Sequence, residues 1–400
     1  MAEPASLRQR SGVASSKNEW SVLLECASPA HDPERLLDLL RSVNWTCLLA
    51  FAEEHGVAGH LAACFLEFRE SLVPSEARQT LVERKRLQNV STLRLNAELF
   101  CVLEIFASEK IGALVVKGPV LAVQAYGDPA IRSYGDLDLL VRQRDIRRAT
   151  ELMSARGFVP AVPPSAIDAG KIPGQYLFSK PDAKLIVELH NDFTLRYFPR
   201  RLPLETFFAR QVSVRVDGHD VPALSVEDEL VLICIHGAKH FWERLMWIAD
   251  VAALVYRQTG IDWDLVADSA RAVKAERMLH TGLHLASDLL KVQLPGKVQA
   301  AVQADAMAAR LAEQCANWLP AAGNAPRGLF ARAAFRLRMR GGLMAAPAYL
   351  WRLSVWPTEE DWRDGPSENQ HLLSSAIRRP FRLARKYRRD RKASKSRNDL

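Results

Sequence analysis

Two aspartates inside an apolar segment constrain this chain more than any other feature. The segment reads Arg132-Ser-Tyr-Gly-Asp-Leu-Asp-Leu-Leu-Val141, and its two acids are Asp136 and Asp138. Alternate side chains of a β-strand point to opposite faces, so the two aspartates share one face while Leu137 and Leu139 share the other. Two carboxylates held side by side in a buried strand repel each other unless a cation or a shared proton lies between them. The pattern therefore predicts a ligand beside this strand.

Two neighbouring segments add to this prediction. An upstream apolar run ends at Lys117-Gly118, and Pro119 follows where the first turn of a helix is expected. A strand end that leads into a helix N-terminus offers backbone N–H groups and a positive dipole, which favour phosphate. A downstream apolar run, 184–190, carries a third acid, Glu188. Three acids on neighbouring strands make an oxygen-rich pocket suited to Mg²⁺ and hence to a nucleoside triphosphate.

This combination resembles the nucleotidyltransferase superfamily of DNA polymerase beta and kanamycin nucleotidyltransferase. More narrowly, it is similar to the bacterial branch of uncharacterised nucleotidyltransferases with a Lys-Gly motif before the paired aspartates. Better-known members carry Gly-Ser where this chain has Lys117-Gly118-Pro119. The resemblance covers most of residues 40–390, through Asn44-Trp45, Lys117-Gly118, Tyr126 to Val141, Val187 to His190, His236 to His240, Trp247 to Asp250, and more weakly Trp356-Pro-Thr and Arg378 to Arg382.

The resemblance implies transfer of a nucleoside monophosphate from a nucleoside triphosphate to an acceptor, with Mg²⁺ or Mn²⁺ as cofactor and pyrophosphate released. Asp136 and Asp138 would hold both metal ions, and Glu188 would complete the site and help to deprotonate the acceptor. The nucleotide would be bound by Lys117, Gly118, Arg132 and Ser133, with Arg132 supplying a bidentate fork for phosphate. An ordinary surface arginine at this position remains an alternative.

A second group of polar residues follows in a predicted helix that begins after Ser225 and continues through Arg244, Trp247 and Asp250. His236, His240 and Arg244 are spaced by four residues and would share one helix face, with Lys239 beside them. A zinc site is not expected, because the glutamate of a metalloprotease and a third ligand are missing. Packing against the central domain is one interpretation, and we favour a face that borders the cleft. His190 would lie on the same strand face as Glu188, either supporting it or acting as a general base.

The predicted fold is α+β with an α/β core: a small mixed sheet flanked by N-terminal and C-terminal helical regions. Hairpins are expected at 175–190 and at 212–223, the second around the strong turn signal Asp217-Gly218. The expected divisions are a tail (1–18), an N-terminal helical region (19–110), the nucleotidyltransferase core (111–224), a C-terminal helical domain (225–320), a helical extension (321–377) and a basic tail (378–400).

Composition narrows the class of protein further. Apolar runs long enough for a transmembrane helix are absent, and residues 1–17 have no apolar core of a secretory signal. Six scattered cysteines lack zinc-site spacing, and we expect reduced thiols in a cytoplasmic protein. The formal charge of +8 comes from residues 378–400, which hold 11 Lys and Arg against 2 Asp and leave the rest of the chain nearly neutral.

Two functions from other classes remain alternatives. One is a non-catalytic descendant of the fold that binds a nucleotide or a protein partner. The other is a protein that contacts an anionic membrane or RNA through its basic C-terminus. The acceptor is not defined by the sequence, so a small molecule, a sugar and a peptide all remain open.

The basic tail gives a first testable prediction. Truncation before Arg378 removes the charged segment and should leave metal-dependent nucleotide turnover unchanged, because the tail has too few apolar residues to pack against the site. Any binding to anionic partners should weaken with salt. Turnover by the parent and truncated proteins is the measurement. A truncated protein that folds normally but has lost turnover would place the tail in the active site.

Overall fold

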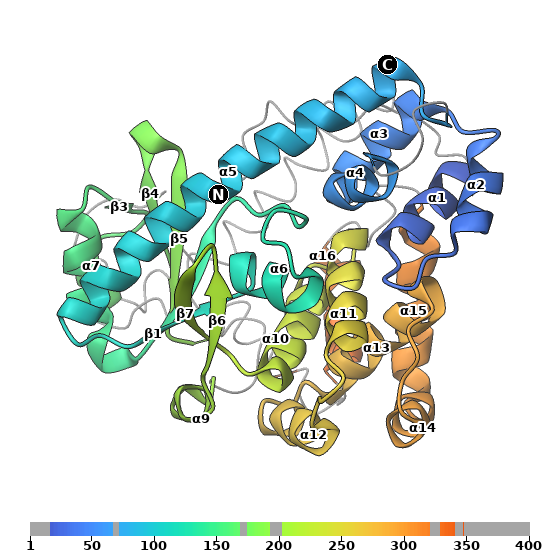
Figure 1. Cartoon of the computed structure of the whole chain (residues 1–400). Helices are drawn as coiled ribbons and strands as arrows, with labels where there is room; N and C mark the ends of the chain where they lie inside the picture. The colour runs from blue at the N-terminus through green and yellow to red at the C-terminus, as the bar shows by residue number, and fades with distance from the viewer. Residues whose placement is uncertain are drawn as a thin grey trace.

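Seven strands form one mixed sheet in the order β3-β4-β5-β2-β1-β7-β6, at the left of the molecule in Figure 1. The structure is a computed structural model that describes residues 17–66, 72–168, 174–192, 202–320, 329–340 and 347. The strands are β1 (Ala113–Val116), β2 (Leu137–Val141), β3 (Val159–Pro160), β4 (Gln175–Lys180), β5 (Leu185–His190), β6 (Val212–Val216) and β7 (His219–Ala223). The small mixed sheet predicted from the sequence is confirmed.

Strand pairing decides which side chains meet at the centre of the sheet. Strand β2 runs antiparallel to β1 and parallel to β5. Its register places Asp138 beside Val116 of β1 on one side and beside Glu188 of β5 on the other. The two predicted hairpins, β4–β5 and β6–β7, are both present and antiparallel. The acids of two chain segments are therefore brought together by backbone pairing.

Helices cover both faces of the sheet. On one face, Leu137 and Leu139 of β2 join a hydrophobic core with α5 (Ser75–Ser108) and α7 (Ile146–Ala155). On the other face, Leu140 joins a larger core that belongs to the helical part of the molecule. The alternation predicted for this strand is therefore observed. Shorter elements connect the strands, namely α6 (Gly118–Tyr126), η3 (Gln143–Asp145), α8 (Pro164–Asp168), η4 (Pro181–Ala183) and α9 (Leu204–Ala209).

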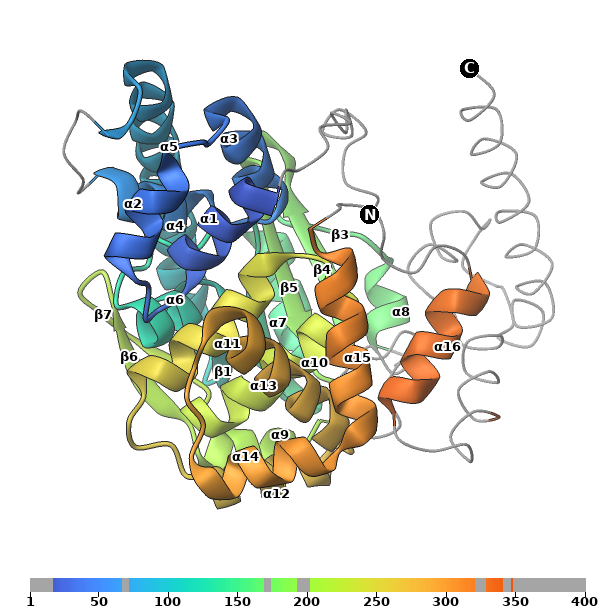
Figure 2. The same ribbon diagram turned by 90° about the vertical axis from the view of Figure 1, so that its right-hand side faces the viewer.

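The N-terminal and C-terminal helices share a single core, which their separation in sequence does not reveal. Buried residues such as Leu23 and Phe65 belong to the same cluster as Ile248 and Leu283. Figure 2 shows the two groups of helices packed beside each other. The N-terminal group is α1 (Lys17–Ala27), α2 (Pro33–Leu40), α3 (Trp45–Glu54) and α4 (Ala58–Leu66). The C-terminal group is α10 (Val226–Lys239), α11 (Leu245–Arg257), α12 (Trp263–Ala272), α13 (Glu276–Leu290), α14 (Gly296–Ala304), α15 (Ala306–Trp318) and α16 (Leu329–Met339).

Helix α5 joins the two parts of the molecule. It has 34 residues, so at 1.5 Å per residue it is about 50 Å long and runs diagonally across Figure 1. Its first turns contribute Ala77 and Leu81 to the helical core. Its second half contributes Leu95 and Leu99 to the core of the sheet. One continuous helix therefore contributes to both cores.

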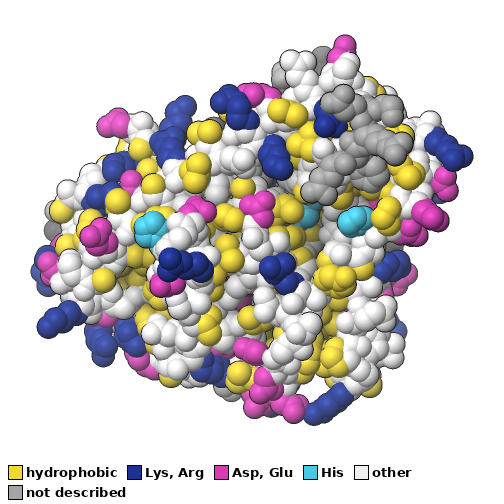
Figure 3. Space-filling model, in the orientation of Figure 1, with side chains coloured by type: hydrophobic (Ala, Val, Ile, Leu, Met, Phe, Trp, Pro, Cys, Tyr) yellow, Lys and Arg dark blue, Asp and Glu magenta, His cyan; other side chains and the backbone are white. Residues whose placement is uncertain are grey.

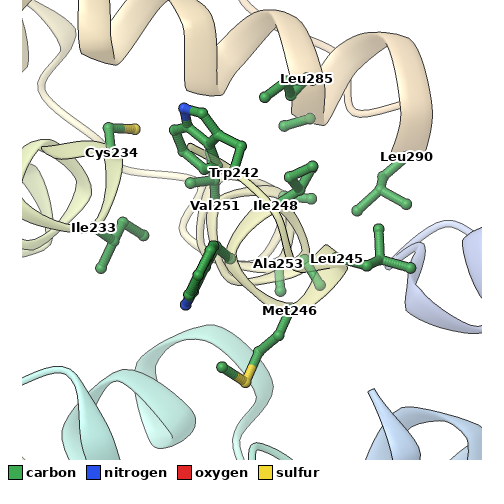
Figure 4. Close-up of a cluster of buried hydrophobic side chains, with 14 of the residues drawn as sticks. Ile233, Cys234, Trp242, Leu245, Met246, Ile248, Val251, Ala253, Leu285 and Leu290 are labelled. Carbon is green, nitrogen blue, oxygen red and sulfur yellow. The ribbon is translucent and has the colours of Figure 1, made fainter. Parts of the chain in front are cut away.

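The prediction of one continuous helix through His236 and Asp250 is wrong. Helix α10 begins at the predicted cap, where the Ser225 side chain accepts a hydrogen bond from the Asp228 N–H, but it ends at Lys239. The N–H of Trp242 donates to the carbonyl of Gly237, and any Cβ on Gly237 would collide with the indole ring. Trp242 is thereby buried beside Cys234, as Figure 4 shows. Burial of a large aromatic ring against glycine outweighs continuation of the helix.

Surface and thiol features agree with the composition. In Figure 3, acidic and basic side chains are interspersed over the visible face. All six cysteines are free thiols. Among the described helices, none has the combination of length and apolar character that a bilayer span requires. Of the expected extension (321–377), the structure describes residues 329–340 and 347, and the basic tail (378–400) lies outside the described residues.

Buried histidines of the helical part make stability sensitive to acid. His60 is 4% exposed, and its ring packs edge-on against Tyr126, with 4.9 Å between ring centroids. Neither of its ring nitrogens has a hydrogen-bond partner within the described part of the chain. Burial, and next the Arg132 guanidinium, lowers the pKa of His60 from 6.5 to about 4. The neutral ring is therefore the form that the fold accepts.

We predict that this histidine destabilises the protein in acid. Its pKa is lower in the folded than in the unfolded chain, so its contribution is intact above pH 6.5 and is lost as pH falls towards 4. The full shift corresponds to about 3 kcal/mol. His60→Phe keeps an aromatic ring and should make the free energy of unfolding less dependent on pH. The measurement is urea unfolding of the parent and the variant from pH 4 to 8. Parallel pH curves for the two proteins would contradict the prediction.

Candidate functional site

A cavity of about 700 Å³ lies between the sheet and helices α10 and α11. Every residue that the sequence assigned to the site lines this cavity, from Lys117 and Gly118 to Arg244. The acids come from β2 and β5, and the histidines come from α10 and the turn after it. Segments separated by more than a hundred residues therefore face one cavity.

Asp138 is the centre of the charge network. Asp138 is buried, with 3% of its surface exposed. Lys117 Nζ lies 2.8 Å from Asp138 Oδ2, and His190 Nε2 lies 2.8 Å from Asp138 Oδ1. Burial alone would favour the neutral acid, but the Lys117 ammonium and the His190 contact outweigh it and hold the pKa of Asp138 well below its usual range. Asp138 is therefore an ionised carboxylate with a cationic or hydrogen-bonding group on each oxygen.

Three side chains offer ligand atoms to one point. Asp138, Glu188 and His190 each present an atom, and these atoms lie within 4.8 Å of one another. Asp136 lies outside this group, although the sequence predicted that it would share the point with Asp138 and Glu188. Asp136 precedes β2 directly and lies one pleat away from Asp138.

The pKa of Asp136 is nevertheless shifted by the same charges. Burial, followed by repulsion from Asp138, raises the pKa of Asp136 to about 6. Lys117 opposes this shift but does not cancel it. Two carboxylates and an imidazole at one point, with a third acid destabilised by their charge, fit a divalent cation. The donor set is thus suited to a metal ion.

Lys117 has an unusual backbone that places two groups in the site. Its φ is 55° and its ψ is −139°, a backbone conformation that residues other than glycine rarely adopt. Its N–H donates to Glu229 Oε1 of α10 at 2.8 Å, while its ammonium reaches Asp138. Gly118 follows with a φ of 40°, and α6 begins there. The strand-to-helix junction predicted before Pro119 is therefore present, with the N-terminus of α6 at the cavity wall.

Arg132 and Ser133 bind partners that the sequence did not reveal. Arg132 Nε lies 2.8 and 3.0 Å from the two oxygens of Asp250 on α11. Arg132 is 5% exposed and Asp250 is 1% exposed, so this is a buried ion pair, which Tyr126 completes by donating to Asp250. The Ser133 hydroxyl donates to Gln88 of α5. The alternative of an ordinary surface arginine is thus wrong, while binding of phosphate by Arg132 stays a prediction, with its Nε paired to Asp250.

The helical wall of the cavity is aromatic and basic. The rings of His236 and His240 lie 4.7 Å apart, and both pack against Trp247. Burial, and then nearby cations such as Lys117 and Lys239, hold the pKa of each histidine well below its usual value. These neutral rings are outside any cluster of metal-ligand type among the described residues.

Three functional residues escaped the sequence analysis. Gln175 of β4 donates its amide to Glu188 Oε2, and its carbonyl oxygen lies 3.5 Å from Lys239 Nζ. Glu229 holds the Lys117 N–H, and burial raises the pKa of Glu229 to about 7. Asp250 pairs with Arg132. Gln175 could have been noted at the start of the predicted hairpin, but no local pattern marks the partners of the other two.

The chain has an α+β fold with an acidic cavity between its sheet and helices α10 and α11. The chain belongs to the family described as uncharacterised nucleotidyltransferase, whose sequence profile matches residues 41–291. No curated protein matches it significantly. A solved structure that it resembles is an antigenic nucleotidyltransferase-like protein from Paracoccidioides brasiliensis, with 16% identity over 55% of this chain and 92% of that chain and a TM-score of 0.32. A superposition this loose says nothing about the chemistry.

The ion pair of Arg132 and Asp250 gives a stability prediction. Asp250→Ala leaves a buried guanidinium without its partner and should cost about 3–5 kcal/mol of unfolding free energy. The double substitution Arg132→Met with Asp250→Leu removes both charges and should recover much of this loss. Asp220→Ala is the control, since Asp220 pairs with Arg215 at the exposed surface and should lose about 1 kcal/mol or less. Urea unfolding that shows equal losses for Asp250→Ala and Asp220→Ala would contradict the structural role.

Proposed function

We propose that this protein transfers a nucleoside monophosphate from a nucleoside triphosphate to an acceptor, with two divalent metal ions. The convergence of Asp138, Glu188 and His190 in a cavity that also contains Asp136 carries this proposal. Membership of a nucleotidyltransferase family supports it independently. Asp136, Asp138 and Glu188 are all present, so no missing acid argues for a purely non-catalytic role.

The acids would hold the metal ions. Asp138 would be shared by both ions, with Asp136 and Glu188 completing the two sites. Bound there, two Mg²⁺ or Mn²⁺ ions would neutralise charge on the attacking and leaving oxygens of an in-line displacement. The negative charges of Asp138 and Glu188 help to raise the pKa of Asp136, and divalent cations would neutralise these charges.

The cations and helix end of the cavity suit a triphosphate. The N-terminus of α6 presents backbone N–H groups beside Lys117 at the wall that carries Asp138. Across the cavity, Lys239 and Arg244 add positive charge. The phosphates would therefore lie between α6 and α10, with charge on both sides to orient the α-phosphorus for attack.

Glu188 would accept a proton from the acceptor group as that group attacks. It lies at the cavity wall, and Gln175 orients its carboxylate. The neutral rings of His236 and His240 with Trp247 form an aromatic wall that suits a planar group of the nucleotide. The chemical class of the acceptor stays open among a small molecule, a sugar and a peptide.

Asp138→Asn tests the proposed function. An amide cannot keep the charge that holds a metal ion, so turnover should fall roughly 10³-fold or more. Release of pyrophosphate from each of the four nucleoside triphosphates, with Mg²⁺ or Mn²⁺ and a panel of acceptors, is the measurement. Asp220→Asn on the exposed β7 is the matched control and should retain activity.

Two results would contradict the proposal. One is a folded parent protein that neither binds nor turns over any nucleoside triphosphate with either metal. The other is turnover that survives Asp138→Asn in a variant whose circular dichroism matches the parent. Glu188→Gln serves as a second variant, because the Glu188 side chain is more exposed than that of Asp138 and its substitution should disturb the fold less.

A further inference from the structure

His190 occupies a position that a simple supporting role does not require. Its Nε2 lies 2.8 Å from Asp138 Oδ1 and 3.4 Å from Glu188 Oε2, so one ring nitrogen faces two carboxylates. The three side chains come from paired positions of two parallel strands: Asp138 is opposite Glu188, and His190 lies one pleat further along β5. In the described part of the chain, these residues form the one group of His, Cys, Asp and Glu with metal-ligand spacing.

Each carboxylate of this group is oriented by a partner outside it. The ammonium of Lys117 holds the other oxygen of Asp138 at 2.8 Å, which leaves Oδ1 towards His190. The amide of Gln175 donates to Glu188 Oε2. Lys239 can only donate, so its contact with Gln175 Oε1 fixes which end of that amide faces Glu188. Such outer partners are typical of side chains that ligate a metal.

We infer that His190 is a direct metal ligand, and that with Asp138 and Glu188 it makes a mixed nitrogen and oxygen site that prefers Mn²⁺ to Mg²⁺. Magnesium prefers oxygen ligands and gives up its waters reluctantly. An imidazole nitrogen binds first-row transition ions more readily than it binds magnesium. The inference rests on the proposed function in one respect, since it takes the acidic cavity to be a site for divalent cations.

Two roles of His190 compete in this account. As a hydrogen-bond donor, it would hold the carboxylates in place while the metal binds oxygens alone. As a ligand, its nitrogen would itself bind the ion. The first role predicts no nitrogen in the coordination sphere, whereas the second requires it. Binding of the metal alone, without nucleotide or acceptor, separates the two.

Metal binding by the full-length protein is the first test. Calorimetric titration with MnCl₂ and MgCl₂ should show Mn²⁺ bound at least about tenfold more tightly than Mg²⁺. His190→Ala should weaken Mn²⁺ binding by at least about tenfold and should affect Mg²⁺ less. His190→Asp replaces the nitrogen with oxygen and should reduce the preference for Mn²⁺ over Mg²⁺. His219→Ala is the control, because that exposed ring stacks on Phe100 away from the cavity.

Pulsed electron paramagnetic resonance of the Mn²⁺-bound protein is the second test. The parent should show modulation from a ¹⁴N nucleus bound to the ion, and both His190→Ala and His190→Asp should lose it. Circular dichroism of each variant checks that it is folded. If His190→Ala does not fold, His190→Asp still decides the question, since it keeps a polar side chain between the two strands.

The outcomes separate this inference from the proposed function. Absence of Mn²⁺ binding, or Mn²⁺ binding that is the same in the parent and both variants and shows no ¹⁴N modulation, overturns the inference. Nitrogen-ligated Mn²⁺ without turnover of any nucleoside triphosphate supports the inference and removes the proposed function. Metal-dependent turnover in a protein whose Mn²⁺ signal lacks nitrogen overturns the inference and leaves the proposed function standing.

Discussion

The buried carboxylate of Asp138 is the interaction on which the rest of the site depends. An ionised group that is 3% exposed would be costly without partners, and here a cation and an imidazole engage its two oxygens. Both partners arrive through strand pairing. Strand β1 ends at Val116, opposite Asp138, and Lys117 follows directly. Strand β5 runs parallel to β2, with His190 one pleat beyond Glu188. A slip of one residue in either pairing would send these side chains to the opposite face of the sheet. The register of three central strands is therefore also the geometry of the site.

The helical part is tied to this centre through a strained residue. Lys117 has a positive φ of 55°, and such a conformation persists only where its surroundings impose it. Glu229 of α10 accepts the Lys117 N–H, and α10 also carries His236 and Lys239 on the opposite wall of the cavity. Arg132 and Asp250 make a second link, between the loop before β2 and α11. The first link is partly buried and the second is buried, so movement of α10 or α11 would disturb the site.

Local patterns in the sequence predicted the parts of the fold that local physics decides. Alternation identified β2, turn residues identified the β6–β7 hairpin, and the helix predicted to begin after Ser225 does begin there. The break between α10 and α11 was missed because it depends on a ring from one segment fitting against Gly237 and Gly282. Asp250, which pairs with Arg132, and Glu229, which accepts the Lys117 N–H, lie more than a hundred residues from these partners, so spacing could not reveal them. The shared core of the N-terminal and C-terminal helices is invisible to local patterns for the same reason. The twelve predicted site residues all reach the cavity, but the part that each plays depends on these distant contacts.

The central claim is that the acids of β2 and β5 bind a divalent cation that receives a nucleoside triphosphate. Anomalous diffraction from crystals grown with Mn²⁺ and a non-hydrolysable nucleoside triphosphate measures this directly. The account predicts an anomalous peak beside Asp138 and Glu188, with the triphosphate between α6 and α10. Triphosphate bound elsewhere, or Mn²⁺ located away from these acids in crystals that contain both, would contradict it.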